Sequence, residues 1–445
     1  MWLIAVVLMT LSLASLGAPS THVATEPGIR VALTQEGLNK VSHDLTGWFQ
    51  ERISSIHPPG INGTVPVWIG AVRYFLTDMS VVRCDLPEPQ VSYADGQGIT
   101  VVLDGLSMHI SGKWRAKLSF LSTGGTFDLA IFNVQVKATL KLGSDKEGHL
   151  SVTTGPCVAS AEKICSTLDI GVQELDRNLT ALPVQLPVGR YVFVAIPLTN
   201  PPTVKGSHAQ IDAKGAFYSR KNATEPPFSP DHFNLTVGRN RMIYFGASEF
   251  CVNTATFAYF TGGLLQINIT DDMIPAQSPI QLNTSDFGEL IPELPRQFPN
   301  ELMTVRLRAS QSPRFSLQAN LWTLDMWLSA DTFAIQPNST LAPLFTLDLN
   351  VTFSGKALIS DGLLKGSMKL SNVSVSLGSS HIGPFSINPL QVAVNNLFTD
   401  VLLPQLNKLL QVGFKMPTVF GYSMVNAQLT IDNGFVSVST DILIK

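Results

Sequence analysis

The sequence has 445 residues, of which 45% are apolar and only 14% are charged, and its formal net charge is −3. A chain of this length is too long to fold around one ordinary hydrophobic core, so we expect two domains. The slight acidity disfavours nucleic-acid binding, and the low charged fraction requires another source of surface hydration.

The first 17 residues, MWLIAVVLMTLSLASLG, are apolar, uncharged and end in small side chains. This pattern is typical of a secretory signal peptide, and the stretch is too short for a membrane anchor. Nine N-x-S/T triplets without proline indicate a glycoprotein, so we expect a secreted, extracellular chain. The triplets begin at Asn62, Asn178, Asn222, Asn234, Asn268, Asn283, Asn338, Asn350 and Asn372.

An amphipathic helix is predicted over residues 35–53, with Thr34 as its N-cap. Its apolar positions follow a period near 3.6 and are Leu38, Val41, Leu45, Trp48, Phe49 and Ile53. From about residue 65 the apolar period changes to two. Residues 133–142, NVQVKATLKL, predict a half-buried antiparallel strand with Thr139 on its outward side.

Residues 111–120, SGKWRAKLSF, place Lys113, Arg115 and Lys117 at alternate positions of a predicted strand. Residues two apart share a strand face, so these cations form a row about 13 Å long with Trp114 on the other side. Residues 18–190 hold 14 Lys and Arg against 16 Asp and Glu, a net charge of −2, so the row is local. Such a row suits closely spaced phosphates, and a solvated strand face is the competing interpretation.

The four cysteines fit an oxidising compartment. Cys157 and Cys165 are close enough in sequence to close a small loop, and we expect a disulfide between them. A zinc site is the rival, but the sequence has no C-x-x-C and no His at ligand spacing. Cys84 and Cys251 are expected to be buried free thiols.

The second half of the chain combines strands with one long helix. A proline-rich stretch, residues 191–230, is interpreted as a linker with irregular strands between a first domain (18–190) and a second (231–445). Alternation predicts strands at 345–353 and 369–377, and a helix from Asn388 to about Leu410 that Pro404 kinks and Gly413 ends. A hairpin turns at Asn433-Gly434. The expected fold class is α+β, in which each half packs one helix on a curved antiparallel sheet around a solid core or a cavity.

No catalytic or metal-binding constellation stands out. GASEF (246–250) lacks the second glycine of a nucleophile elbow, and adjacent Asp271 and Asp272 read as turn residues. The eight His residues are scattered. We therefore expect no catalytic residue, no metal, no cofactor and no enzymatic activity.

Several motifs resemble the bactericidal permeability-increasing / lipopolysaccharide-binding protein family over nearly all of the mature chain. They are EPGIRVALTQEGLNKVS, SGKWRAKLSFLSTGGTFDLAI, KGAFYSRKNATEPPF, FNLTV, MIYFGASEFCVNTA, INITDDMIP and HIGPF.

The resemblance implies an elongated, boomerang-like secreted protein of innate defence, with two barrels joined by a central sheet. Each barrel would hold an apolar pocket for phospholipid acyl chains, so bound phospholipid is expected. The basic tip of the first barrel would contact the lipid A phosphates of lipopolysaccharide at the surface of Gram-negative outer membranes. That role falls on Lys113, Arg115 and Lys117. We expect a monomer.

Three departures from the family pattern bear on this expectation. Leu118 stands where several members are basic, and the neighbouring stretch 54–67 has no Lys or Arg. The family's disulfide joins cysteines that match Cys157 and Cys165, but a further strand and most of a long helix are expected to be missing between them. The stretch 163–182 keeps helical spacing as a remnant, so the wall of the first pocket is in doubt.

Two other functions stay open at this point. A lipid-transfer protein for neutral or zwitterionic lipids would use the pockets without the tip. An adhesive or scaffolding glycoprotein would have solid barrels.

Overall fold

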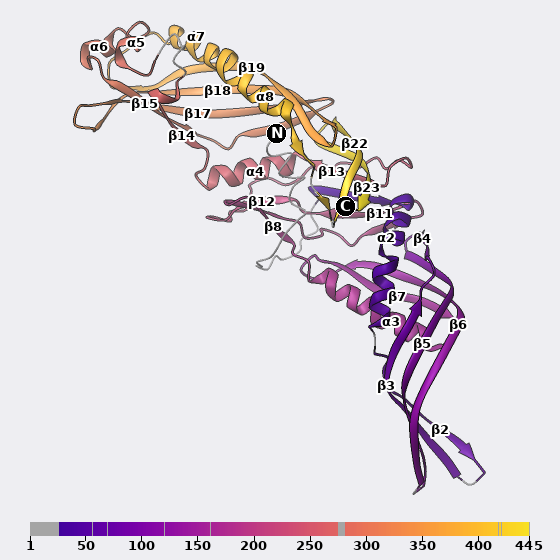
Figure 1. The fold of residues 1–445 in the computed structure, drawn as a ribbon. Helices are drawn as coiled ribbons and strands as arrows, with labels where there is room; N and C mark the ends of the chain where they lie inside the picture. The colour runs from indigo at the N-terminus through magenta and orange to yellow at the C-terminus, as the bar shows by residue number, and fades with distance from the viewer. Residues whose placement is uncertain are drawn as a thin grey trace.

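The computed structural model describes residues 26–55, 57–68, 70–119, 121–160, 162–274, 281–416, 418–419 and 421–444. The expected signal peptide, 1–17, lies outside these residues. The molecule is elongated, with one sheet at each end and a sheet between them (Figure 1). This confirms the expected α+β architecture of two barrels joined by a central sheet.

The N-terminal barrel is a six-stranded antiparallel sheet with the order β2-β3-β5-β6-β7, in which β4 also pairs with β5. Its helix α2 begins after Thr34, whose hydroxyl accepts a hydrogen bond from the backbone N–H of Gly37, as expected of an N-cap. The side chains of Trp48, Phe49 and Ile53 lie outside the described ones. The elements are α2 (Gln35–Ser54), β2 (Ile61–Val67), β3 (Gly70–Asp85), β4 (Gln90–Ala94), β5 (Gly98–Leu118), β6 (Leu121–Ser144), β7 (Leu150–Ala159) and α3 (Glu162–Thr180).

The central sheet takes strands from several distant parts of the chain, in the order β10-β11-β1-β13-β23-β22-β21. Strands β12, β9 and β8 form a separate three-stranded sheet in that order. The predicted second domain, 231–445, includes residues 424–444, whereas β22 and β23 pair in the central sheet. Alternation predicts the buried face of a strand but not its partner strand. The strands are β1 (Ile29–Thr34), β8 (Gln185–Val188), β9 (Val192–Ala195), β10 (Thr203–Lys205), β11 (His208–Ala213), β12 (Ala216–Ser219), β13 (Ile243–Ser248), β21 (Thr418–Val419), β22 (Tyr422–Asp432) and β23 (Phe435–Ile444).

The C-terminal barrel is a sheet with the order β14-β15-β17-β18-β19-β20, and β16 pairs with β17. Its strands are β14 (Gln266–Thr270), β15 (Leu302–Ala309), β16 (Arg314–Gln318), β17 (Leu321–Ile335), β18 (Leu341–Ser360), β19 (Leu363–Ser380) and β20 (Phe414–Lys415). Its helical segments are α4 (Glu249–Thr261), η1 (Asp271–Met273), α5 (Thr284–Phe287), α6 (Glu293–Gln297), α7 (Asn388–Asn396), η2 (Leu397–Leu402) and α8 (Leu403–Val412).

The long helix of this barrel is continuous over α7, η2 and α8, and η2 is a π-helical turn. Pro404 lacks the N–H that would bond the carbonyl of residue 400, so the irregular turn lies just before it, where the kink is expected. The helix ends at Gly413, which has φ +81°. The hairpin of β22 and β23 also turns through a glycine with positive φ, Gly434 at +81°.

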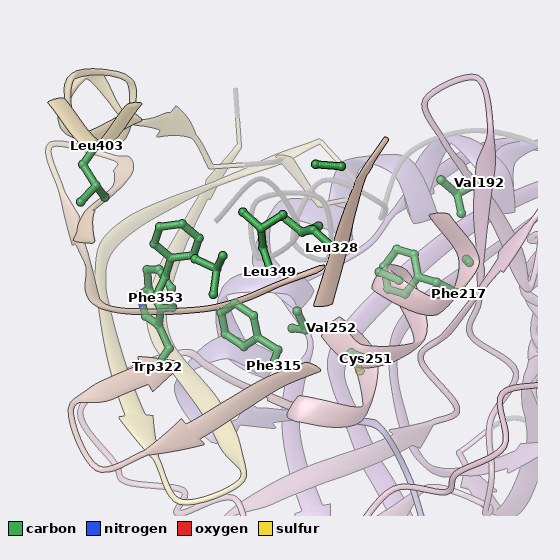
Figure 2. Packing of buried hydrophobic residues seen from close by; sticks show 14 of the residues in the cluster. Val192, Phe217, Cys251, Val252, Phe315, Trp322, Leu328, Leu349, Phe353 and Leu403 are labelled. Atoms are coloured by element: carbon green, nitrogen blue, oxygen red, sulfur yellow. The ribbon is translucent and has the colours of Figure 1, made fainter. Parts of the chain in front are cut away.

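One large apolar core runs from the central sheet into the C-terminal barrel (Figure 2). Phe315 and Trp322 stack with ring centroids 5.3 Å apart, and both are almost fully buried. Cys84 of β3 and Cys251 of α4 are buried, and Cys251 has no exposed surface. Both are free thiols, as expected. No helix within the described ranges is long and apolar enough to cross a membrane.

Candidate functional site

The cationic row lies at the outer end of β5, where the N-terminal sheet extends beyond helices α2 and α3 (Figure 1). Lys113, Arg115 and Lys117 are exposed, whereas Trp114 and Leu118, on the other face, are half-buried. The alternation read from the sequence is therefore present in the structure.

The neighbouring strand β3 adds a fourth cation that the sequence analysis missed. Arg73 is directly opposite Lys117, and Phe75 is directly opposite Arg115. Directly opposed residues of an antiparallel pair share a face and have Cα atoms about 4.5–5.5 Å apart. We call the set Arg73, Lys113, Arg115 and Lys117 the cationic face.

The third strand of this face, β6, contributes small side chains. Ser122, Gly124 and Thr126 lie opposite Lys117, Arg115 and Lys113. Gly124 has no side chain, and a Cβ there would come within 2.6 Å of the Trp114 carbonyl oxygen. Together these strands line an open hollow of about 920 Å³. The hollow puts hydroxyl groups and cations around one space, which suits an anion with several oxygen atoms.

The charges on this face are unevenly compensated. Lys113 Nζ lies 3.0 Å from Asp78 Oδ2, and both side chains are mostly exposed. Lys117 Nζ lies 6.0 Å from the centre of the Phe75 ring. Within the described part of the chain, Arg73, Arg115 and Lys117 form no ion pair. The uncompensated positive charge is therefore concentrated toward the end of the barrel.

The sequon at Asn62 lies on this same face. Asn62 of β2 is opposite Phe75, and Phe75 is opposite Arg115, so the three residues form one cross-strand line. Asn62 is exposed. Two strand spacings, about 10 Å, separate Asn62 from Arg115, so a glycan there would lie beside the cationic face.

The other eight sequons differ in exposure. Asn283 is half-buried, and its side chain accepts a hydrogen bond from the Asp286 backbone N–H as the N-cap of α5. The remaining seven sequon asparagines are exposed.

A second feature of the N-terminal barrel is an apolar cavity of about 310 Å³ between the sheet and helices α2 and α3. Its lining is almost entirely aliphatic, with Leu38, Val41 and Leu45 from α2. Strand residues of β5 and β6, including Leu103, Met108 and Val136, form the opposite wall. A space of this size and composition suits a hydrocarbon chain.

Helix α3 closes this cavity. The cavity is lined on this side by Ile164, Leu168, Val172 and Leu175 of α3. The predicted helix remnant, 163–182, therefore supplies a wall of the first pocket. Cys157 of β7 and Cys165 of α3 form the expected disulfide, which fixes α3 to the sheet. Strand β7 ends at Ala159 and α3 begins at Glu162. The missing element between the cysteines stays a prediction.

Among the residues that the structure describes, one group of potential metal ligands lies in the turn between β6 and β7: Asp145, Glu147 and His149. Asp145 Oδ1 accepts hydrogen bonds from the backbone N–H groups of Glu147 and His149, and its Oδ2 lies 2.7 Å from His149 Nδ1. Partial burial acts to raise the pKa of Asp145, but the hydrogen bonds from His149 and Glu147 outweigh it and hold the pKa below its usual value. These contacts account for the group as turn chemistry, and we assign no metal to it.

Comparisons with known proteins place both halves of the chain in one family. Residues 37–182 match the description "LBP / BPI / CETP family, N-terminal domain" and residues 188–444 match "LBP / BPI / CETP family, C-terminal domain". The bactericidal permeability-increasing protein of Sebastes schlegelii is 30% identical, over 99% of this chain and 98% of that protein. The lipopolysaccharide-binding protein of Homo sapiens is 24% identical, over 94% of each.

A crystal structure of lipopolysaccharide binding protein has a similar fold. It aligns with a TM-score of 0.51 and 21% sequence identity, covering 94% of this chain and 100% of that chain. At this identity the likeness supports the two-barrel fold.

Proposed function

The chain belongs to the LBP / BPI / CETP family, and we propose that it is a secreted, non-enzymatic lipid-binding protein of innate defence. Its ligand is lipopolysaccharide: the cationic face binds phosphate groups of lipid A, and the apolar cavity holds an acyl chain of lipopolysaccharide or of a phospholipid. The protein acts as a monomer at the surface of Gram-negative bacteria.

The observation that carries this proposal is the opposed pair Arg73 and Lys117, with Arg115 beside it. Like charges at facing positions of a sheet repel each other, and the described residues supply them with no acidic partner. A phosphate group between them accepts charge-assisted hydrogen bonds from both side chains. Lipid A carries phosphates together with acyl chains, which is the combination that this barrel could accommodate.

The names of the relatives support the same ligand class. One is called a lipopolysaccharide-binding protein and another a bactericidal permeability-increasing protein. The first name refers to binding of lipopolysaccharide and the second to killing of bacteria. The net charge of −2 over residues 18–190 favours recognition of a compact headgroup over general attraction to anionic membranes.

A lipid-transfer protein for neutral or zwitterionic lipids is the second candidate. The cavity favours it, because a lining of aliphatic side chains selects no headgroup. A purely adhesive glycoprotein with solid barrels is the least supported, since the cavity lies where its core would be.

Titration of the secreted protein with lipopolysaccharide at low and high salt tests the proposal, with phosphatidylcholine as the competing ligand. We expect tight binding to lipopolysaccharide that weakens as salt rises, because exposed charges are screened. Equal, salt-independent binding of phosphatidylcholine would favour the lipid-transfer function. Native mass spectrometry of the purified protein should also show a bound lipid that organic extraction removes.

A further inference from the structure

The face of the central sheet that points away from the core carries polar side chains from the neighbouring strands β13, β23 and β22 (Figure 1). Ser439 of β23 lies between Gln428 of β22 and Tyr244 of β13. Ser437 lies directly opposite Thr430 of β22. Directly opposed residues of an antiparallel sheet share a face, so these hydroxyl and amide groups lie together on one side of the sheet.

The segment before β13 crosses this face and forms a wall on it. A Cβ at Gly246 would come within 2.8 Å of the Phe233 ring and 3.2 Å of Leu235, so the missing side chain lets the segment lie close to the sheet. Phe233 stacks on Phe435 with ring centroids 4.9 Å apart. The Phe233 carbonyl accepts a hydrogen bond from the guanidinium group of Arg30, which also lies 5.1 Å from the Phe233 ring. These contacts fix the wall in place.

The sheet and this wall enclose a hollow of about 230 Å³. Its polar lining consists of Thr236, Tyr244, Gln428, Thr430, Asp432, Ser437 and Ser439. Tyr244 donates a hydrogen bond to Asn240 Oδ1. Within the described part of the chain, the other side chains of this lining form no hydrogen bond and no ion pair. They are therefore available to a ligand.

The chemistry of the lining favours a neutral ligand with several hydroxyl groups. Asp432 is the one charged side chain among the described lining residues, so phosphate and sulfate groups are disfavoured. Serine, threonine and glutamine side chains both donate and accept hydrogen bonds, as sugar hydroxyl groups require, and an ionised aspartate accepts them strongly. Phe435 adds an apolar surface that suits the C–H face of a sugar ring. The volume suits a single ring.

We propose that this hollow is a sugar site that binds one neutral hexose ring, with Asp432 and Ser437 bonded to its hydroxyl groups and Phe435 packed against its C–H face. The ring comes either from a separate saccharide or from a glycan of the protein itself, because the sequon at Asn234 is two residues before Thr236 of the wall. The inference goes beyond the proposed function and does not depend on it, since neither the cationic face nor the apolar cavity takes part.

The test is saturation-transfer NMR of the full-length secreted protein with the methyl glycosides of glucose, mannose and galactose. At least one glycoside should receive saturation from the protein. The double variant Asp432→Ala with Ser437→Ala should bind it about tenfold more weakly or worse, because a charge-assisted contact and a hydroxyl contact are lost. The matched control is Asp348→Ala with Ser379→Ala, which removes the same groups from exposed positions of β18 and β19. The control should bind like the wild type.

The variant Thr430→Phe blocks the hollow instead of removing contacts. Thr430 is exposed on β22, and an aromatic residue suits a strand, so the fold should be kept. Saturation transfer to the glycosides should disappear. Equal transfer in Thr430→Phe and in the wild type, with circular dichroism showing an intact fold, would overturn the proposal.

Choline is the probe for the competing ligand, a cation held by the Asp432 carboxylate. The variant Asp432→Asn keeps a hydrogen-bonding oxygen but loses the charge, so it should retain part of the glycoside binding. Choline binding that Asp432→Asn abolishes, with no transfer to any glycoside, would replace the sugar site with a cation site.

Removal of the sequon distinguishes the two sources of the sugar. If the ligand is a separate saccharide, the wild type and Asn234→Gln should bind the glycosides equally. If the glycan of Asn234 fills the hollow, only Asn234→Gln should bind them, and the other variants are then compared in that background. No glycoside binding by either protein would overturn the proposal.

Discussion

Arg73 and Lys117 lie directly opposite each other where β3 pairs with β5. Facing like charges destabilise a sheet by a few tenths of a kcal/mol to about 1 kcal/mol, so the barrel keeps this pair at a cost. Two long side chains at one end of a sheet can turn toward solvent, which keeps that cost small. A bound phosphate would remove the repulsion, which is the physical reason for the anion site that we propose at this pair.

The ion pair of Lys113 with Asp78 predicts a variant that strengthens ligand binding. Asp78 has φ +52°, a conformation that asparagine also tolerates, so Asp78→Asn removes the charge and keeps the backbone. An exposed pair of this kind is worth at most about 1 kcal/mol, so the fold should be unaffected. Affinity for lipopolysaccharide should rise a few-fold, measured by titration at low salt. The control, Asp95→Asn in the turn before β5, should leave affinity unchanged, and a weaker Asp78→Asn protein would argue against the electrostatic account.

Gly171 predicts a variant that is more stable and binds less lipid. It lies on α3 and lines the apolar cavity, and an added Cβ would meet nothing within 4 Å. Gly171→Leu should raise the unfolding free energy by about 2–4 kcal/mol through helix propensity and apolar burial. Native mass spectrometry should show less co-purifying lipid.

Gly47→Leu is the matched control, because Gly47 is an exposed residue of α2 that also has free space around it. It should gain only the helix-propensity part, about 1 kcal/mol, and keep its lipid. Full lipid retention in Gly171→Leu would mean that the cavity is not the acyl-chain site.

The buried thiols predict how stability depends on alkaline pH. Burial, with a smaller contribution from Asp85, raises the pKa of Cys84 to about 11, and burial raises the pKa of Cys251 to about 12 despite opposing hydrogen bonds from Ser248. The unfolded thiols ionise near 9.0. Between about pH 9 and pH 11 the unfolded state releases these protons and the folded state keeps them, so the unfolding free energy should fall as pH rises through this range. Below about pH 9 both states keep the protons, and the contribution of the thiols to the unfolding free energy is complete.

Thermal unfolding between about pH 8 and pH 10 measures this effect. The Cys84→Ala and Cys251→Ala double variant should show a shallower fall of the melting temperature with pH than the wild type. A control with Val134→Ala and Val252→Ala creates cavities without removing a thiol, and it should keep the wild-type slope. Parallel slopes in all three proteins would contradict the assignment to the thiols.

The position of Asn62 predicts that its glycan limits access to the cationic face. Asn62 shares a cross-strand line with Phe75 and Arg115, so a glycan there is close enough to obstruct large anionic ligands. Peptide mapping should find Asn62 occupied in the secreted protein, and Asn62→Gln should bind lipopolysaccharide a few-fold more tightly. Asn372→Gln, an exposed sequon of β19, is the control. An unmodified Asn62, or equal affinities, would remove this role.

Local features of the fold were predictable from the sequence because they depend on neighbouring residues. The helix expected over residues 35–53 is α2, and the row on β5 follows from two-residue alternation. Arg73 was missed because its place opposite Lys117 depends on the register between strands about 40 residues apart, which no local pattern contains. Thr139 was expected to face outward but is buried, since the register of β6 with β7 shifts between Ala138 and Leu140.

The most direct test of the account is the affinity of the variant Arg73→Ser, Arg115→Ser, Lys117→Ser for lipopolysaccharide, compared with the wild type at low and high salt. Lys113 is left in place because Asp78 already compensates it. Each lost charge-assisted contact is worth about 1.5–3 kcal/mol when partly desolvated, so binding should weaken tenfold or more and lose its salt dependence. The variant Lys137→Ser, Lys141→Ser, which removes two exposed cations of β6 away from the tip, should bind normally. Unchanged affinity in the first variant, with circular dichroism showing an intact fold, would mean that the cationic face is only a solvated surface.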